Sequence, residues 1–334
     1  MAGITDVARA SGVSTATVSR ALRGLPNVAE ETRIAVRRAA DALGYVPSSS
    51  ASGLASGRTL AMGVVVPNVS RWFYTSVLEG IDDELRIAGY DTVLFNLGAR
   101  GDERARVFHR SILRKRTDAV IALCLDFSAD EREHLASLGH PTVVVGGPVP
   151  GLAYVGIDEF GTARAATEHL VALGHRDIAY IGGDSQHGLN PRVPTLRRRG
   201  FRRAMTTAGL PVRREWVERG DDLTISGGHA AALRMLHRTP RPTAVFAASD
   251  ESAIGVILAA RELGIAVPGE LSVIGIDDHP LAPSFALTTM AQDAVGQGRS
   301  AARLMLDELG GAPRSAAAIR FPTTLVERAS TAAR

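Results

Sequence analysis

A group of hydroxylated side chains near the start of the chain, with one methyl and one guanidinium among them, has the types and spacing needed to read the edges of DNA bases. It consists of Thr15, Ala16, Thr17, Ser19 and Arg20, all within one stretch predicted to be helical. Hydroxyl groups can bond bases or phosphates, a methyl group can contact thymine, and a guanidinium can bond both acceptors of a guanine edge. A slim helix face of this composition can enter a major groove. The alternative is a helical hairpin with a structural role only.

Three short helices are predicted to carry this face. The pattern of apolar residues and caps favours helices over 6–11, 15–23 and about 29–43, the last ended by Gly44. Thr5 and Ser14 stand where a side-chain hydroxyl can accept a free N–H of a first helical turn, so we expect both to be N-caps.

The turn between the first two helices has the residues that a helix-turn-helix needs. Ala8 is small enough for close helix approach, Gly12 tolerates a positive φ in the turn, and Val18 supplies an inward apolar side chain.

Charge supports a nucleic-acid module at this end. The chain has 38 basic and 35 acidic residues, a net charge of +3. Residues 1–60 hold seven arginines and four acidic residues, which is +3, so the remaining 31 basic and 31 acidic residues cancel. Basic side chains drive nucleic-acid binding by neutralising phosphates. A solvated helix face would give a similar local charge, and that alternative stays open on charge alone.

Composition limits the class of protein. A chain of 334 residues, 45% hydrophobic and 22% charged, favours a folded protein of two or three domains. No apolar run is long enough for a membrane helix and no signal peptide precedes the first helix, so we expect a cytoplasmic protein with no membrane partner. Cys124 is the only cysteine, which excludes an internal disulfide and multi-cysteine metal sites. We expect no metal and no cofactor.

Beyond a small-residue stretch at 48–57, strands and helices alternate, which predicts an α/β fold with parallel sheets buried on both faces. Two similar lobes are expected, with a ligand site in the cleft between them. The predicted strands are LAMGVVVP, DTVLF, DAVIAL, TVVVGG, DIAYIGG, AVFAA and LSVIGID. The predicted helices are 74–88, 102–113, 130–138, 162–173, 196–208, 226–237 and 252–263.

The sequence resembles bacterial transcriptional repressors of the LacI/GalR type along essentially its whole length. The resemblance rests on ITDVARASGVSTATVSRALRG, VAEETRIAVRRAADALGYVP, VGIDEFGTARAATEHLVALGHRDIAYIGG, RPTAVFAASDESAIGVILAARELGIAVPGELSVIGIDD, LTTMAQD and LVERAST, in family order. It implies a helix-turn-helix headpiece at 1–47, a hinge helix at 48–58 and a core at 59–334 shaped like a periplasmic binding protein. The core would divide into an N-lobe, about 59–160 and 291–321, and a C-lobe, about 161–290 and 322–334.

The resemblance also implies roles in DNA binding. Thr15, Ala16 and Arg20 correspond to base-reading residues, and Thr5, Ser14, Thr17 and Ser19 lie nearer phosphates. Leu54 matches the hinge leucine that wedges into the minor groove of the operator, where unstacking is offset by bending and new contacts. Gly53 departs from the family and would cost a helix about 1 kcal/mol relative to alanine, so we expect the hinge to fold only on DNA.

For the cleft, the resemblance implies a small-molecule effector bound by seven residues: Asn68, Trp72, Phe73, Arg197, Asp222, Ser249 and Asp277. Aromatic faces stack on sugars, and carboxylates and guanidinium groups bracket hydroxyls. We therefore expect a sugar or sugar derivative. A nucleoside or purine corepressor is the alternative, disfavoured because Asp222 stands where relatives often have an aromatic ring.

Each of these residues has a simpler alternative reading. Trp72 and Phe73 could belong to the core, Arg197 to a solvated basic face, and Asp277 to a helix cap. Asp126 is a weaker candidate, and Arg192 stays unassigned.

Functions of other classes are disfavoured. No phosphate-binding loop, dinucleotide fingerprint, zinc-protease motif or nucleophile elbow occurs, so a sugar-metabolising enzyme is a remote reading. A solute-binding transport protein would need export. We expect a dimeric, effector-controlled transcription regulator that is not an enzyme.

Overall fold

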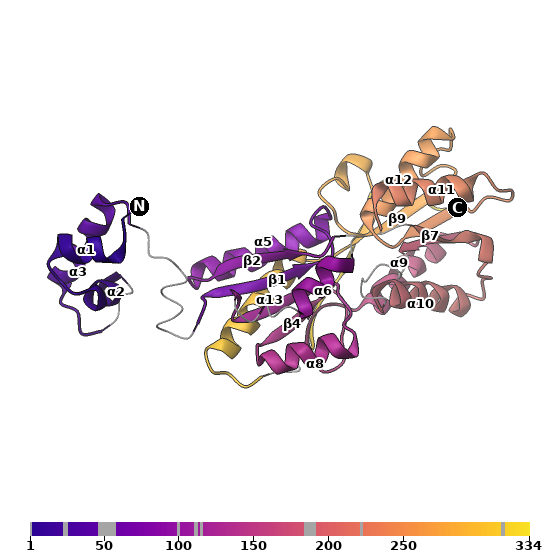
Figure 1. The fold of residues 1–334 in the computed structure, drawn as a ribbon. Coiled ribbons are helices and arrows are strands. Elements are labelled where there is room, and N and C mark those ends of the chain that lie inside the picture. The colour runs from indigo at the N-terminus through magenta and orange to yellow at the C-terminus, as the bar shows by residue number, and fades with distance from the viewer. Residues whose placement is uncertain are drawn as a thin grey trace.

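The computed structural model describes residues 2–22, 26–45, 58–98, 101–109, 113, 116–183, 192–220, 223–314 and 318–334. Its first three helices, α1 (Ile4–Ser11), α2 (Thr15–Leu22) and α3 (Glu30–Ala42), form a separate small unit (Figure 1). Their apolar faces meet in a core that includes Val7, Ala8, Val18, Val36 and Ala40.

The helix-turn-helix geometry predicted for this unit is confirmed. Gly12 ends α1 with a φ of 69°, a left-handed conformation that suits glycine because it has no Cβ. Gly44, which follows the end of α3, also has a positive φ, of 59°.

One predicted cap is wrong. Helix α1 starts earlier than expected, with Gly3 as its N-cap, and the carboxylate of Asp6 accepts the Gly3 N–H at 2.9 Å. Thr5 is therefore the second residue of the helix. The acid at the third helical position offers a charged acceptor near the positive end of the helix dipole, so the helix needs no hydroxyl at residue 5.

The N-lobe is built on a parallel six-stranded sheet in the order β11-β5-β4-β3-β1-β2. Its strands are β1 (Ala61–Val66), β2 (Asp91–Asn96), β3 (Ala119–Leu123), β4 (Thr142–Val145), β5 (Ala153–Ile157) and β11 (Ala318–Phe321). Its helices are α5 (Trp72–Ile87), α6 (Gly101–His109), α8 (Ala129–Leu138) and α13 (Ala294–Leu309).

The C-lobe repeats this plan in the order β12-β10-β9-β8-β6-β7, with only β10 and β12 antiparallel. Its strands are β6 (Ile178–Gly183), β7 (Val217–Gly220), β8 (Ala244–Ala247), β9 (Ser272–Asp277), β10 (Thr288–Ala291) and β12 (Thr324–Val326). Its helices are α9 (Glu159–Ala172), α10 (Arg192–Thr207), α11 (Ile225–Leu236) and α12 (Asp250–Glu262). The fold class expected from the sequence is confirmed.

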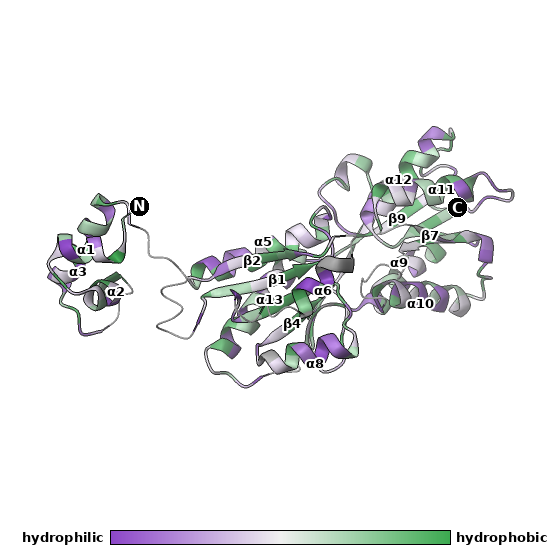
Figure 2. Ribbon diagram, viewed as in Figure 1, coloured by the Kyte–Doolittle hydropathy of each residue, from purple (hydrophilic) through white to green (hydrophobic). Residues whose placement is uncertain are grey.

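Both sheets are covered on both faces, which explains their continuous apolar strands. In β1, Met62 and Val64 pack into a core with α5 and α13, and Val65 points into a second core with Phe108. Figure 2 shows this arrangement by hydropathy: the strands are mostly green, or hydrophobic, and the helices around them mix green with purple, or hydrophilic, residues.

Helices α5 and α13 cross with their backbones almost in contact. A Cβ on Gly80 would overlap the carbonyl oxygen of Val295, and one on Gly298 would overlap that of Val77. Glycine at both positions fixes where α5, and with it Trp72 and Phe73, lies on the N-lobe.

The seven predicted strands and the seven predicted core helices are present, but each of these helices begins earlier than predicted, and helix α13 was not predicted. Helix α9 begins at Glu159 instead of 162, because the Asp158 side chain caps it by accepting the Gly161 N–H at 3.0 Å. Helix α10 begins at Arg192 instead of 196, and α12 at Asp250 instead of 252. The structure also has five strands that were not predicted, β5, β7, β10, β11 and β12. They are short, with three to five residues each.

Candidate nucleic-acid interface and ligand site

Helix α2 presents the polar face predicted from the sequence. Ser14 is its cap: the hydroxyl accepts the Thr17 N–H at 3.1 Å and lies 2.9 Å from the Thr17 hydroxyl. Thr15, Ala16 and Arg20 are exposed, whereas Val18 on the opposite face is fully buried. The small core therefore holds α2 by one face and leaves the other open to a groove.

The residues predicted to lie near phosphates are also accessible. Ser14 and Thr5 are exposed, and Thr17 and Ser19 are half-buried. The remaining predicted DNA contact, Leu54 in the hinge, lies outside the described residues, as does the effector candidate Asp222.

The three N-lobe candidates lie at the carboxyl end of β1 and the start of α5. The Asn68 carbonyl oxygen accepts the N–H and hydroxyl of Ser70, at 2.9 and 3.0 Å, which leaves its amide nitrogen as a donor. Trp72 and Phe73 are half-buried against the N-lobe core. Each ring therefore packs partly in the core, as the alternative reading expected, and stays partly accessible.

The described C-lobe candidates are all buried. Ser249 caps α12 by accepting the Ser252 N–H at 3.2 Å, and its hydroxyl donates to the Leu223 carbonyl at 3.1 Å. Asp277 ends β9 with a φ of 134°, a strained conformation for a residue with a side chain. Its carboxylate accepts the Gln292 side-chain N–H at 2.6 Å.

Arg197 is the charged centre of this group and is not part of the solvated basic face. Its Nε donates to Glu159 Oε2 at 2.5 Å, and its Nη1 donates to the Ala248 carbonyl. Its side chain is 6% exposed and that of Glu159 is 4% exposed. Burial by itself would lower the pKa of Arg197, but the charges of Glu159 and Asp277 outweigh it and raise the pKa. The guanidinium is therefore permanently charged and already oriented.

Two neighbouring carboxyl groups have raised pKa values because they are buried. Burial raises the pKa of Asp277 to about 6, although Arg197 acts in the opposite direction. Burial and the charge of Asp277 raise the pKa of Asp250 to about 8. Asp250 accepts the Thr289 hydroxyl at 2.6 Å and the His279 N–H at 2.8 Å. The group therefore offers both donors and acceptors to a ligand.

Contacts between the lobes bring the candidates together. Arg71, the residue before α5, donates to Glu251 of α12 at 2.9 Å and to the Leu223 carbonyl at 2.6 Å. The Trp72 ring lies 5.2 Å from the His279 ring, measured between centroids. These two contacts place the start of α5 against the ends of the C-lobe strands, beside Ser249 and Asp277.

Sequence reasoning missed Glu159, Asp250, Arg71 and Glu251. A signal for Glu159 was present, because Val193, Arg197, Gly200, Phe201 and Ala204 share one face of a helix. An arginine on an apolar face needs a buried acid. No comparable pattern marks the other three.

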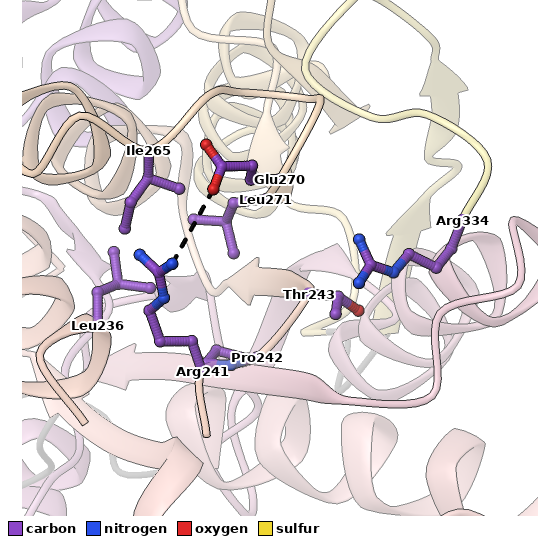
Figure 3. Close-up of a pocket in the computed structure, with 8 residues that line it drawn as sticks. All are labelled: Leu236, Arg241, Pro242, Thr243, Ile265, Glu270, Leu271 and Arg334. Atoms are coloured by element: carbon purple, nitrogen blue, oxygen red, sulfur yellow. Dashed lines mark ion pairs between the residues drawn. The ribbon is translucent and has the colours of Figure 1, made fainter. Parts of the chain in front are cut away.

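A cavity of about 490 Å³ lies between the lobes next to this group. Glu159, Asp158 and Arg192 line it, together with Leu152 of the N-lobe and Leu196 of α10. Its volume is in the range of small-molecule sites. A second cavity, of about 270 Å³, lies elsewhere, beside the starts of β8 and β9 (Figure 3). Its Arg241 pairs with Glu270 at 3.9 Å, and none of the described effector candidates lines either cavity.

The single thiol has the properties of a core group. Burial raises the pKa of Cys124 to about 12, so it is protonated near neutral pH and is not a nucleophile. No group of three potential metal ligands occurs in the described ranges. No helix in the described part of the chain has the length and apolar character needed to span a membrane.

A helix-turn-helix unit with a free polar face, joined to two lobes with a cavity and a buried charged cluster between them, defines the class of DNA-binding regulators with a ligand-binding core. Comparison with known proteins agrees with this class. Residues 3–48 match bacterial regulatory proteins of the lacI family, and residues 167–331 match the periplasmic binding protein-like domain.

The full-length relatives are transcription regulators. Catabolite control protein A of Priestia megaterium is 32% identical over 332 residues, 98% of each chain. The repressor PurR of Pectobacterium carotovorum is 34% identical, over 99% of this chain and 97% of its own. The chain belongs to the lacI family of bacterial regulatory proteins and is a DNA-binding transcription regulator.

Solved structures show the same fold. A Lac repressor dimer bound to operator and the anti-inducer ONPF has a TM-score of 0.85 at 27% identity, covering 99% of both chains. A complex of the transcriptional regulator CelR with cellobiose has a TM-score of 0.72 at 31% identity, covering 99% of this chain and all of that one.

Proposed function

We propose that the protein represses transcription in the cytoplasm by binding a palindromic operator as a homodimer, under the control of a small molecule held between its lobes. The observation that carries this proposal is the free face of α2 joined to a core that has a cavity and a buried charged cluster between its lobes. The boundaries expected from the sequence, a headpiece at 1–47, a hinge at 48–58 and a core at 59–334, belong to the proposal.

We assign base reading to Thr15, Ala16 and Arg20. Arg20 is the only one of the three with a guanidinium, and the small core leaves it exposed. Thr5, Ser14, Thr17 and Ser19 would contact phosphates, which position a headpiece without specifying sequence. Leu54 of each hinge would enter the minor groove at the operator centre, so that specificity needs two chains.

The test compares two arginines of the headpiece. An operator is first selected from random duplexes with the wild-type protein, and binding is measured by fluorescence anisotropy. Arg20→Ala should cost about 1–3 kcal/mol and relax selectivity at one base position. Arg9→Ala is the control: Arg9 has the same charge and is paired with Asp6 at 3.3 Å on α1. The Arg9→Ala variant should lose less binding affinity than Arg20→Ala, and its loss should be the same for all operator sequences. Unchanged selectivity in Arg20→Ala would overturn the assignment.

For the effector we propose a sugar or sugar derivative. Arg197 and Asp277 offer a charged donor and a charged acceptor in one buried cluster, the arrangement that suits neighbouring hydroxyls. Trp72 supplies a partly accessible ring, and Asn68 a free amide donor. Phe73, Ser249 and Asp222 complete the proposed set. The cellobiose complex of CelR is consistent with this class of ligand.

A thermal-shift panel of carbohydrates, nucleosides and purine bases tests the ligand class. A sugar that binds only the folded protein should raise its melting temperature by mass action. Asp277→Asn should abolish the shift, and Asp126→Asn should not, since Asp126 is not part of the cluster. A shift produced by purines or nucleosides alone would favour the alternative corepressor.

The switch would act through the contacts between the lobes. A ligand that changes the Arg71–Glu251 and Trp72–His279 contacts would change the relative placement of the lobes, and so the spacing of the two hinges in a dimer. The coupling must be reciprocal, so operator DNA must alter effector affinity by the same factor. Equal effector affinity with and without operator would rule out this switch.

A further inference from the structure

The excess positive charge of the core is concentrated in one segment, from α10 to β7. Residues 192–220 contain nine arginines and two glutamates, a net charge of 9 − 2 = +7, whereas residues 61–334 as a whole sum to zero. The rest of the core is therefore acidic, and the positive charge is gathered in α10 and the segment that follows it.

Helix α10 concentrates four of these arginines on one face, which we call the α10 patch: Arg198, Arg199, Arg202 and Arg203. At about 100° per residue they fall within an arc of roughly 140°. Arg199, Arg202 and Arg203 are exposed and Arg198 is half-buried, while the opposite face of the helix packs against α9. In Figure 2 the outer side of α10 is mostly purple, the colour of hydrophilic residues.

The four arginines of the patch have no partner in the part of the chain that the structure describes. Among the described residues, none of the four arginines makes an ion pair or hydrogen bond. Arginines elsewhere on the surface do pair: Arg86 with Asp83 at 2.7 Å, Arg234 with Glu218 at 3.4 Å and Arg303 with Glu84 at 2.6 Å. An unopposed cluster of like charges attracts polyanions and repels itself, so its retention calls for an outside partner.

The composition of the patch favours a phosphate backbone over a protein partner. Stable protein interfaces centre on buried aromatic or apolar side chains, and none of the large exposed hydrophobic residues lies on α10. The other exposed side chains there include Thr206 and Thr207. Guanidinium and hydroxyl groups are the side chains that bind nucleic-acid phosphates without reading sequence.

The position of the patch separates it from the DNA under the headpiece. The chain enters the core through β1 of the N-lobe, and α10 belongs to the C-lobe. Figure 1 shows α10 at the end of the core remote from the start of β1. We propose that the α10 patch binds the phosphate backbone of a second DNA segment, without sequence preference, while the headpieces hold the operator.

A bridging assay with the full chain tests this proposal. The protein is saturated with fluorescent operator duplex, mixed with a biotinylated duplex of unrelated sequence, and captured on streptavidin at low salt. Wild-type protein should retain operator fluorescence, and the variant Arg198→Gln/Arg199→Gln/Arg202→Gln/Arg203→Gln should lose at least about nine-tenths of it. Four phosphate contacts predict a slope near −3.6 in log K against log salt concentration for the second duplex, and the variant should lose that slope.

The matched control removes four positive charges elsewhere. Arg86→Gln/Arg234→Gln/Arg241→Gln/Arg303→Gln has the same net charge as the patch variant, but all four arginines are paired with carboxylates. It should bridge like wild type, and both variants should keep wild-type operator affinity and melting temperature. No capture by the wild type, or equal capture by the patch variant, would overturn the proposal. Equal loss in both variants would do so as well, because net charge alone would then account for binding.

Discussion

The buried pair of Glu159 and Arg197 gives a sharp test of how the C-lobe holds its charged centre. Glu159→Gln keeps the shape of the side chain and removes its charge. Arg197 stays protonated in this variant, because a guanidinium does not lose its proton in proteins. It would therefore remain as a buried cation, bonded to the Ala248 carbonyl and compensated only in part by Asp277.

The expected cost follows from burial. Removing one partner of a buried ion pair typically costs 3–5 kcal/mol, because the other charge stays desolvated. The glutamine can still accept a hydrogen bond from Nε, so we expect about 3 kcal/mol. This corresponds to a fall of roughly 6–12 °C in the melting temperature of the lobe. Urea unfolding of the full chain, followed by far-UV circular dichroism, measures the change.

The same helix provides the control. Glu168 of α9 pairs with Arg164 at 3.6 Å, but these side chains are 49% and 50% exposed. Glu168→Gln should therefore cost less than about 1 kcal/mol. A double variant, Glu159→Gln/Arg197→Met, should recover part of the loss, because no unpaired charge remains. If Glu159→Gln costs no more than Glu168→Gln, the reasoning from burial is wrong.

Three further predictions concern stability. Ser14→Ala should destabilise the headpiece by about 1 kcal/mol, seen as a lower melting temperature of its helices, because the α2 cap is lost; an unchanged melt would contradict this. Gly80→Ala should destabilise the N-lobe by more than about 2 kcal/mol in urea unfolding, since the new Cβ meets the Val295 carbonyl. Gly89→Ala has open space around it and should leave the α5–α13 packing intact, so it should cost only the backbone strain of its positive φ of 72°, about 1 kcal/mol. The pKa of Asp277 in the folded state is raised from 3.8 to about 6. Between pH 4 and pH 6 the folded state therefore holds a proton that the unfolded state releases. As the pH rises through this range, Asp277 should lower the free energy of unfolding by about 3 kcal/mol. This part of the pH dependence should vanish in Asp277→Asn. A pH profile of stability identical to that of the wild type would refute the prediction.

The sequence predicted the fold well where a pattern is local. Seven strands were recognisable as apolar runs, six of them buried and one, β2, a largely accessible edge strand. Gly12, Val18 and Ser14 marked the helix-turn-helix because turn, contact and cap each need one kind of residue. Helix starts were placed less well. Asp158 caps α9 four residues before the predicted first residue, and acids at such positions are not distinguishable from surface charge by pattern alone.

The candidate ligand residues were less predictable. Arg197 was chosen from a run of arginines by family resemblance, and the structure separates it, as a buried ion-paired residue, from the α10 patch, where three arginines are exposed and Arg198 is half-buried. Arg71 and Glu251 are 180 residues apart in the chain, so no spacing could link them.

By itself, the sequence determined the classes of element, the order of the headpiece and two lobes, and the polar face of α2. These depend on residue type and short-range periodicity, which a linear chain displays directly. Only the tertiary structure decided which charges are buried together: Glu159 with Arg197, Asp250 with Asp277, and Arg71 with Glu251. The physical reason is that desolvation and Coulomb energies depend on distance in space and on burial, and both are set by how distant segments pack.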